Sequence, residues 1–123
     1  MMARAVKCRV LDKNVTLCFN LAAQQKLCEH YSGIEAAMED FQQSAGSEDE
    51  AQSLSCIAAW VAALSTGGAA YDKVVTGEQT DTVTADELLA LCTPYDIAEL
   101  ATNASKAIID GSTTEIATAK KKK

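Results

Sequence analysis

The hydrophobic pattern changes period once, at Asn20, and this change constrains the fold more than any other feature of the sequence. Before Asn20, apolar residues alternate with polar ones in two short runs, which is typical of strands with one buried face. These residues are Val6, Cys8 and Val10, then Val15, Leu17 and Phe19. After Asn20, apolar residues recur at helical spacing. The sequence therefore predicts a mainly helical α+β fold that begins with a β-hairpin over residues 5–19.

The segment between the two predicted strands has the composition of a tight turn. Asp12-Lys13-Asn14 fits a three-residue loop, because Asn14 tolerates the left-handed backbone conformation that ends such a loop. An isolated two-stranded ribbon is at best marginally stable in water. We therefore expect helices to pack on the apolar face of the hairpin.

Two amphipathic helices are predicted directly after the hairpin. Asn20 is a good N-cap for the first. Ser32-Gly33-Ile34-Glu35 matches a capping box for the second, in which Ser32 caps the helix and Glu35 reaches back. The next segment, residues 42–50, is polar, acidic and contains glycine, so it is predicted to be a mobile loop.

A wide apolar stripe predicts a central helix over residues 51–65. Its members are Leu54, Ile57, Ala58, Val61, Ala62 and Leu64. Trp60 lies at the edge of the stripe, where it fits either a core residue, the favoured interpretation, or the anchor of a protein interface. Gly67-Gly68 is predicted to end this helix, with a short helical stretch around Tyr71 after it.

Two further helix starts are visible in the C-terminal half. Thr84-Ala85-Asp86-Glu87 is a second capping box, and Thr93-Pro94 places proline at the first position of a closing helix that is predicted to stop at Gly111. Residues 112–123 have no apolar periodicity, so they are predicted to form a flexible, lysine-rich tail. The expected architecture is one domain over residues 1–111, with about five short helices over residues 21–110.

Charge and cysteine content limit the possible partners and location. Residues 14–119 carry 16 carboxylates against three lysines, so this body repels phosphate backbones and nucleic acid is not an expected partner. No run of apolar residues has the length of an uninterrupted membrane span, and the N-terminus lacks a signal-peptide core. The five cysteines form no metal-binding spacing, and their odd number suits a reducing compartment. We expect a cytoplasmic protein that binds other proteins and no membrane.

Side-chain patterns for catalysis, metal binding or cofactor binding are missing from the sequence. His30 is the only histidine, which leaves a two-histidine metal site or a Cys/His nucleophile without support. Glu39-Asp40 and Glu48-Asp49-Glu50 lack the ligand spacing of a calcium loop and fit a solvated surface better. The glycines match no phosphate-binding loop. No catalytic, cofactor-binding or metal-binding residue is therefore predicted, and the protein is expected not to be an enzyme.

The order of these parts resembles the tail assembly chaperones of long-tailed bacteriophages and prophages. The resemblance covers about residues 5–111. It rests on the hairpin that leads into Asn20-Leu21-Ala22-Ala23-Gln24, the helix of residues 54–64, the Thr84–Leu89 helix start and the closing helix of residues 97–111.

The resemblance implies a non-enzymatic function in virion morphogenesis. Members of this family bind the tape measure protein, keep its long apolar helices soluble, help to recruit tail tube subunits, and leave before the mature virion is complete. Many of them also have a longer form made by ribosomal frameshifting. Lys120–Lys123 lie where such a slippery site would be, provided that their codons form an uninterrupted adenine run.

The composition leads to the same kind of mechanism, in which amphipathic helices cover the apolar helix of another protein. The predicted protein-binding residues are Trp60, Val61, Leu64 and Tyr71. Because so small a domain leaves apolar surface around Trp60, we also expect a homo-oligomer.

Two other functions stay open. A small acidic adaptor or regulatory protein would have the same composition. An acyl-carrier-like module would also be acidic and helical, but it needs a helix-capping serine in an Asp-Ser-Leu context, and Gln52-Ser53-Leu54 lacks the acidic residue. A tape measure gene next to the coding sequence would favour the chaperone.

Overall fold

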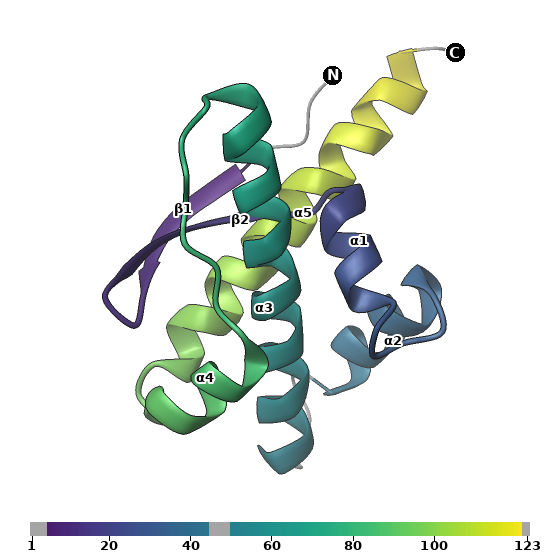
Figure 1. Ribbon diagram of the computed structural model, residues 1–123. Helices are drawn as coiled ribbons and strands as arrows, with labels where there is room; N and C mark the ends of the chain where they lie inside the picture. The colour runs from purple at the N-terminus through teal and green to yellow at the C-terminus, as the bar shows by residue number, and fades with distance from the viewer. Residues whose placement is uncertain (1–4, 45–49, 122–123) are drawn as a thin grey trace.

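The computed structural model describes residues 5–44 and 50–121, and the side chains of residues 5–44 and 51–109. In this part of the chain an N-terminal hairpin is followed by five helices, which confirms the predicted mainly helical class (Figure 1). In chain order the elements are β1 (Ala5–Val10), β2 (Lys13–Cys18), α1 (Leu21–Leu27), α2 (Ile34–Ser44), α3 (Glu50–Val75), α4 (Ala85–Leu91) and α5 (Ile97–Lys121).

The hairpin turn is tighter than predicted and lies earlier in the chain. β1 and β2 are antiparallel and pair from Ala5 with Cys18 to Val10 with Lys13. The two residues between them, Leu11 and Asp12, have φ angles of 54° and 62°. Positive φ at both central positions is the turn geometry whose twist matches that of paired strands. The turn is therefore Leu11-Asp12, and the predicted Asp12-Lys13-Asn14 loop is wrong.

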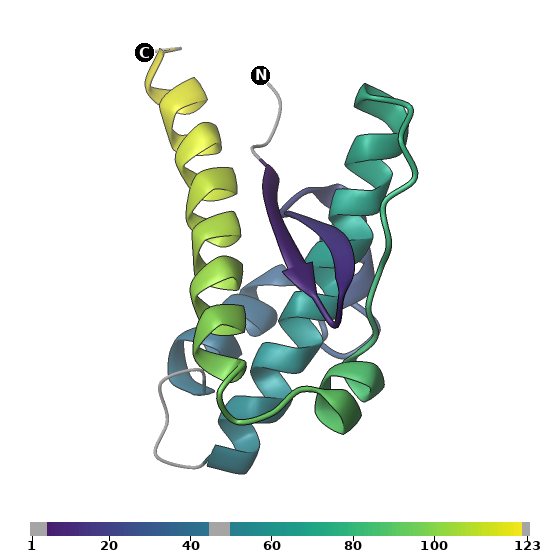
Figure 2. The same cartoon turned by 90° about the vertical axis from the view of Figure 1, so that its left-hand side faces the viewer.

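The hairpin lies between α5 and the C-terminal half of α3 (Figure 2); α5 contacts both strands, whereas α3 packs mainly on β2. The register places Val6, Cys8, Val15 and Leu17 on one face of the hairpin, and this face belongs to the hydrophobic core. Helices α1 and α2 pack on the other side of α3 (Figure 1). Helix α3 is thus the centre of the fold, and Trp60 in its middle contacts the rings of Phe19 and Phe41.

Helix α3 continues through Gly67-Gly68, so the predicted helix end at these glycines is wrong. The reason is a close crossing with β2. A Cβ at Gly68 would overlap the Thr16 carbonyl group and lie 2.9 Å from Thr16 Cβ. A Cβ at Gly67 would overlap the Cys18 carbonyl oxygen and lie 2.9 Å from Ala23 Cβ. Glycine is needed here for contact between backbones, and the helix tolerates it at a cost of about 1 kcal/mol per residue.

Two predicted caps are confirmed and one is not. Asn20 caps α1, since its Oδ1 accepts a hydrogen bond from the Ala23 N–H at 3.0 Å. The capping box that opens α4 is complete: Thr84 Oγ1 accepts from the Glu87 N–H, and Glu87 Oε1 accepts from the Thr84 N–H. Helix α2, however, begins at Ile34, so Gly33 precedes it in place of the predicted cap Ser32.

The other predicted element ends also shift. Thr93–Asp96 forms a turn in which Asp96 Oδ2 accepts from the Thr93 N–H at 2.8 Å, so α5 begins at Ile97, about one turn later than predicted. The α5 backbone stays helical to Lys121, past the predicted stop at Gly111. In the predicted loop of residues 42–50, residues 42–44 belong to α2 and residue 50 begins α3. Residues 45–49 lie outside the described residues, and so do Lys122 and Lys123.

Helix α3 is long and apolar enough to cross a membrane by length and composition. In this fold it is the core helix, and 61% of its most apolar window is buried inside the protein. A buried core helix passes the same length and composition criteria as a membrane span, so this finding does not indicate a membrane protein.

Candidate protein-binding groove

Three of the four predicted protein-binding residues are buried in the core. Trp60, Val61 and Leu64 have no exposed surface, and Tyr71 is partly buried near the C-terminal end of α3. The Trp60 ring lies 5.1 Å from Phe41 and 5.8 Å from Phe19, measured between ring centroids. The favoured core interpretation of Trp60 is therefore confirmed. In this structure, Trp60, Val61 and Leu64 cannot contact a partner directly.

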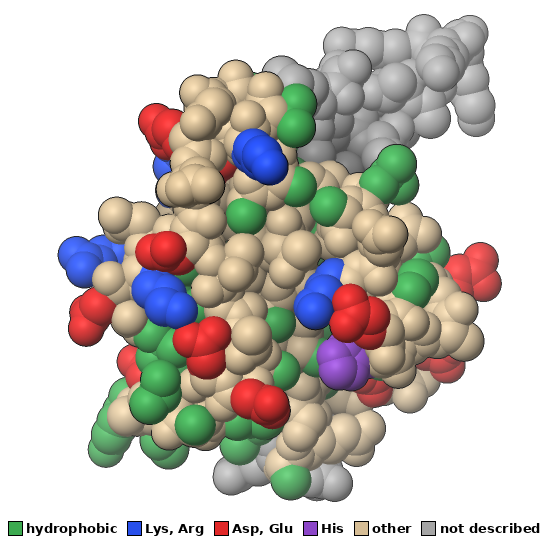
Figure 3. All heavy atoms as spheres, in the orientation of Figure 1, with side chains coloured by type: hydrophobic (Ala, Val, Ile, Leu, Met, Phe, Trp, Pro, Cys, Tyr) green, Lys and Arg blue, Asp and Glu red, His purple; other side chains and the backbone are tan. Residues whose placement is uncertain are grey.

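Exposed apolar side chains are found instead around α4. Leu89 is 53% exposed and Leu91 is 64% exposed, and Tyr95 and Leu54 are also exposed. In Figure 3 hydrophobic side chains gather over α4 and the start of α5, at the lower left, with acidic side chains beside them. Such gathered apolar surface on a small protein marks a contact site more often than single scattered residues do.

A groove of about 630 Å³ runs between the first half of α3, α4 and the start of α5. Its walls are mostly apolar. They consist of Ser53, Leu54, Ile57 and Ala58 from α3, Leu88, Leu89, Cys92, Thr93 and Pro94 from α4 and the turn after it, and Ile97, Ala98, Leu100 and Ala101 from α5. Helices that meet around an apolar groove can receive an amphipathic helix, whose apolar side chains fill the groove at every third or fourth position.

Local sequence explains how the groove forms. Helix α4 is only seven residues long, because the Thr84 capping box opens it and the chain leaves helical geometry at Cys92. Leu88 is buried against α3, while Leu89, one position on, points outward on the groove side. The Thr93–Asp96 turn then starts α5 close to α4, so both helices line the same groove.

The charged side chains in the segment that forms most of this groove are all acidic. Residues 74–105 contain six carboxylates and no lysine, arginine or histidine. One of them, Glu87, forms an ion pair with Lys13 of the hairpin, with Nζ and Oε2 2.9 Å apart. The hydrogen bond from Lys13 lowers the pKa of Glu87. Asp86 and Asp96 are exposed carboxylates, two residues before Leu88 and directly before Ile97 of the groove, and no ion pair to them is found among the described side chains.

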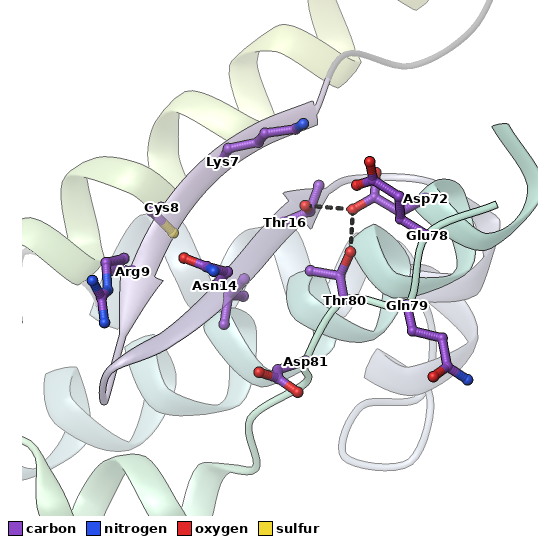
Figure 4. Close-up of a pocket in the computed structure, with 11 residues that line it drawn as sticks. Lys7, Cys8, Arg9, Asn14, Thr16, Asp72, Glu78, Gln79, Thr80 and Asp81 are labelled. Carbon is purple, nitrogen blue, oxygen red and sulfur yellow. Dashed lines mark hydrogen bonds between the residues drawn. The ribbon is translucent and has the colours of Figure 1, made fainter. Parts of the chain in front are cut away.

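A second pocket, of about 540 Å³, is polar and lies between the hairpin and residues 78–81 (Figure 4). Asp72 is one of its lining residues and is only 2% exposed. Asp72 Oδ2 accepts hydrogen bonds from Thr16 Oγ1 at 2.6 Å and from Thr80 Oγ1 at 2.5 Å. Asp81 forms a parallel bridge with Val15 of β2. These contacts tie the loop after α3 to the hairpin, and they account for the buried carboxylate structurally.

Another polar cluster joins the segment between α1 and α2 to α2 and α3. Tyr31 donates a hydrogen bond to Asp40 Oδ2 at 2.5 Å, and Ser44 donates to Asp40 Oδ1 at 2.7 Å. The bond from Tyr31 lowers the pKa of Asp40. Burial, together with the Asp40 carboxylate, raises the pKa of Tyr31. Burial and the same carboxylate raise the pKa of Cys56 to about 12. At neutral pH Asp40 is therefore ionised while Tyr31 and Cys56 stay protonated, and the hydrogen bonds of Asp40 tie the segment before α2 to the end of α2.

All five cysteines are free thiols. Burial raises the pKa of Cys8 and Cys92, and raises that of Cys18 to about 11, so these thiols stay protonated at neutral pH. No group of three or more potential metal ligands is found among the described residues. His30 is exposed in the turn after α1, where its backbone N–H donates a hydrogen bond to the Leu27 carbonyl oxygen.

The sequence patterns predicted the helices that line the groove but not the groove itself. The signal was present in Leu88-Leu89-Ala90-Leu91, a run too apolar to bury all its side chains on a helix of seven residues.

Comparison with protein-family models, curated proteins and solved structures finds no match to this chain.

Proposed function

We propose that this chain is a non-enzymatic tail assembly chaperone, which binds the tape measure protein of a phage or prophage and keeps it soluble. The observation that carries the proposal is the groove with exposed Leu89, because it offers a client helix an apolar surface that water would otherwise cover. The order of parts that resembles this family, from hairpin to closing helix, adds support.

The mechanism would be helix-in-groove masking. A tape measure helix would place its apolar stripe against Leu54, Leu89 and Ile97, which lie on three different helices. Burial of apolar area is worth about 25 cal/mol per Å², so covering a few leucines is enough for a reversible contact. Reversibility suits a chaperone that helps to recruit tail tube subunits and leaves before the virion matures.

The proposal includes a cytoplasmic location in the host cell and self-association of the free chaperone. Exposed apolar side chains away from the groove, among them Val74 at the end of α3, leave surface for a second copy. Sedimentation equilibrium over a wide concentration range would test self-association, and a strictly monomeric chain would contradict it.

Co-expression with the tape measure protein encoded beside this chain tests the function. The client is expected to be soluble with the wild-type chain and insoluble without it. Leu89→Asp should abolish this effect, because it places a charge in the groove. Leu91→Asp is the matched control, because Leu91 is exposed on the same helix but does not line the groove. A client that is equally soluble without the chain contradicts the proposal.

The acyl-carrier alternative loses support from the position of Ser53. This serine lies inside the first turns of α3, after its start at Glu50, and is partly buried, whereas a carrier serine caps its helix. Unchanged intact mass after treatment with a phosphopantetheinyl transferase would exclude this function. A small acidic adaptor remains the alternative, and the neighbouring genes distinguish it from the chaperone.

A further inference from the structure

The groove is apolar inside, while the helices that form it carry charge of one sign. Asp86 lies one helical turn before Leu89 on α4, and Asp96 directly precedes Ile97 at the start of α5. Both carboxylates are exposed. No cation occurs in α4 or between it and Ser105 to balance them, and Lys13 is already paired with Glu87.

We infer that this groove selects an amphipathic client helix whose apolar stripe is flanked by lysine or arginine. The inference rests on the proposed function, because both place a client helix in the same groove. Leucine-like side chains of the client would fill the space lined by Leu54, Leu89 and Ile97. Its flanking cations would then lie beside Asp86 and Asp96, where opposite charges favour association and like charges oppose it.

A second copy of the chain fits this groove less well than such a client. Symmetric association through the groove would bring α4 of one copy against the same region of the other, since a two-fold interface uses one patch on both subunits. Asp86 and Asp96 would then face carboxylates of the second copy. Like charges held together in an interface oppose its formation, so the charge pattern favours a cationic partner.

Two synthetic peptides of about 18 residues, or five helical turns, test the inference. Both carry leucine at helical spacing; one has lysine on both flanks of the stripe, and the other has glutamate at the same positions. Binding of each labelled peptide to the full-length chain is measured by fluorescence anisotropy. At low salt the lysine peptide should bind about threefold to tenfold more tightly, as expected for a few exposed charge pairs. At about 1 M salt, where the Debye length is about 3 Å, the difference should disappear.

Variants locate the effect within the groove. Asp86→Asn should reduce the preference for the lysine peptide without abolishing its binding. Leu89→Asp should weaken the binding of both peptides strongly. Leu91→Asn, which adds no charge at an exposed position outside the groove lining, should leave the binding of both unchanged. Circular dichroism melts of each variant confirm that the chain is still folded.

Each other outcome overturns the inference in a distinct way. If both peptides bind equally and Leu89→Asp abolishes both, charge selection is wrong while helix binding in the groove stands. If neither peptide binds, the groove is not a site for helices of this kind, and co-expression still decides the chaperone function separately. If sedimentation shows a dimer that Leu89→Asp dissociates, a second copy is the occupant and the inference fails.

Discussion

Gly68 of α3 packs directly against the backbone of Thr16 in β2, without room for a Cβ atom between them. This contact fixes the hairpin on the central helix. It also brings the Thr16 hydroxyl within 2.6 Å of Asp72, one turn further along α3, so the close crossing and the buried hydrogen bond reinforce each other.

Gly68→Ala is expected to destabilise the fold by at least about 2 kcal/mol. Alanine gains about 1 kcal/mol of helix propensity, but its Cβ would collide with backbone atoms that cannot rotate away, and overpacking of this kind typically costs more. Gly33→Ala is the matched control, because a Cβ there meets nothing within 4 Å. Urea denaturation measures both variants, and equal stability for Gly68→Ala would show that the helix can move away from β2.

The same glycine pair shows what the sequence could predict of the fold and what it could not. The hairpin, the order of the helices and two of the caps could be predicted from local patterns. The alternation of apolar and polar residues, the helical spacing of apolar residues and the capping side chains each involve only a few neighbouring residues. The meaning of Gly67-Gly68 depends on a strand about fifty residues away in sequence. A helix end and a close helix crossing look the same in a single sequence.

The candidate site was less predictable for a related reason. Helix α3 is apolar on nearly all sides, so its stripe could not tell which face stays exposed, and Trp60 and Leu64 proved to be core residues. The groove exists only because α4 and α5 pack beside Leu54 and Ile57. That arrangement is a tertiary property, and no local pattern encodes it.

Loss of the buried carboxylate at Asp72 is expected to loosen the loop after α3. Asp72→Ala leaves the buried Thr16 hydroxyl without its partner, which costs about 1–3 kcal/mol. It also frees Thr80, so backbone amides near residue 80 should exchange hydrogen faster. Asp81→Ala is the control, because the Asp81 side chain is exposed while its bridge to Val15 uses the backbone. If amide hydrogen exchange near residue 80 is unchanged in Asp72→Ala, the Asp72 carboxylate does not hold this loop on the hairpin.

The Tyr31–Asp40 hydrogen bond predicts a stability difference that depends on pH. The folded-state pKa of Asp40 is below its ordinary 3.8, so its contribution is present above pH 3.8 and is lost as the pH falls through the folded value. The pKa of Tyr31 is above its ordinary 10.0, so its contribution is present below pH 10.0 and is lost as the pH rises toward the folded value.

Tyr31→Phe should therefore be about 1 kcal/mol less stable than the wild type between pH 5 and 9, with the difference shrinking at both extremes. Urea denaturation from pH 2 to 11 measures the difference. Tyr95→Phe is the control, because Tyr95 is almost fully exposed. A difference that stays constant from pH 2 to 11 would show that the bond with Asp40 does not contribute.

Trp60→Ala should destabilise the chain by about 3–5 kcal/mol, because it empties the space between Phe19 and Phe41 in the core. Trp60→Phe should cost less than about 2 kcal/mol. It keeps an aromatic ring in place and removes the indole N–H, which is buried and has no hydrogen-bond partner among the residues that the structure describes. Thermal melts measure both. If Trp60→Phe melts as low as Trp60→Ala, the indole has a role that packing does not explain.

Removal of residues 112–123 is expected to change the free energy of unfolding by less than about 0.5 kcal/mol. Among the α5 side chains that the structure describes, the buried ones are Leu100, Ala104, Ala107 and Ile108, and all four precede Gly111. The removed segment contributes four lysines at its end and no apolar periodicity. A shorter chain that stops at Asn103 should unfold, because it loses three of these four core residues. If removal of residues 112–123 alone lowers stability by more than about 2 kcal/mol in urea denaturation, the end of α5 packs on the body and is not a free extension.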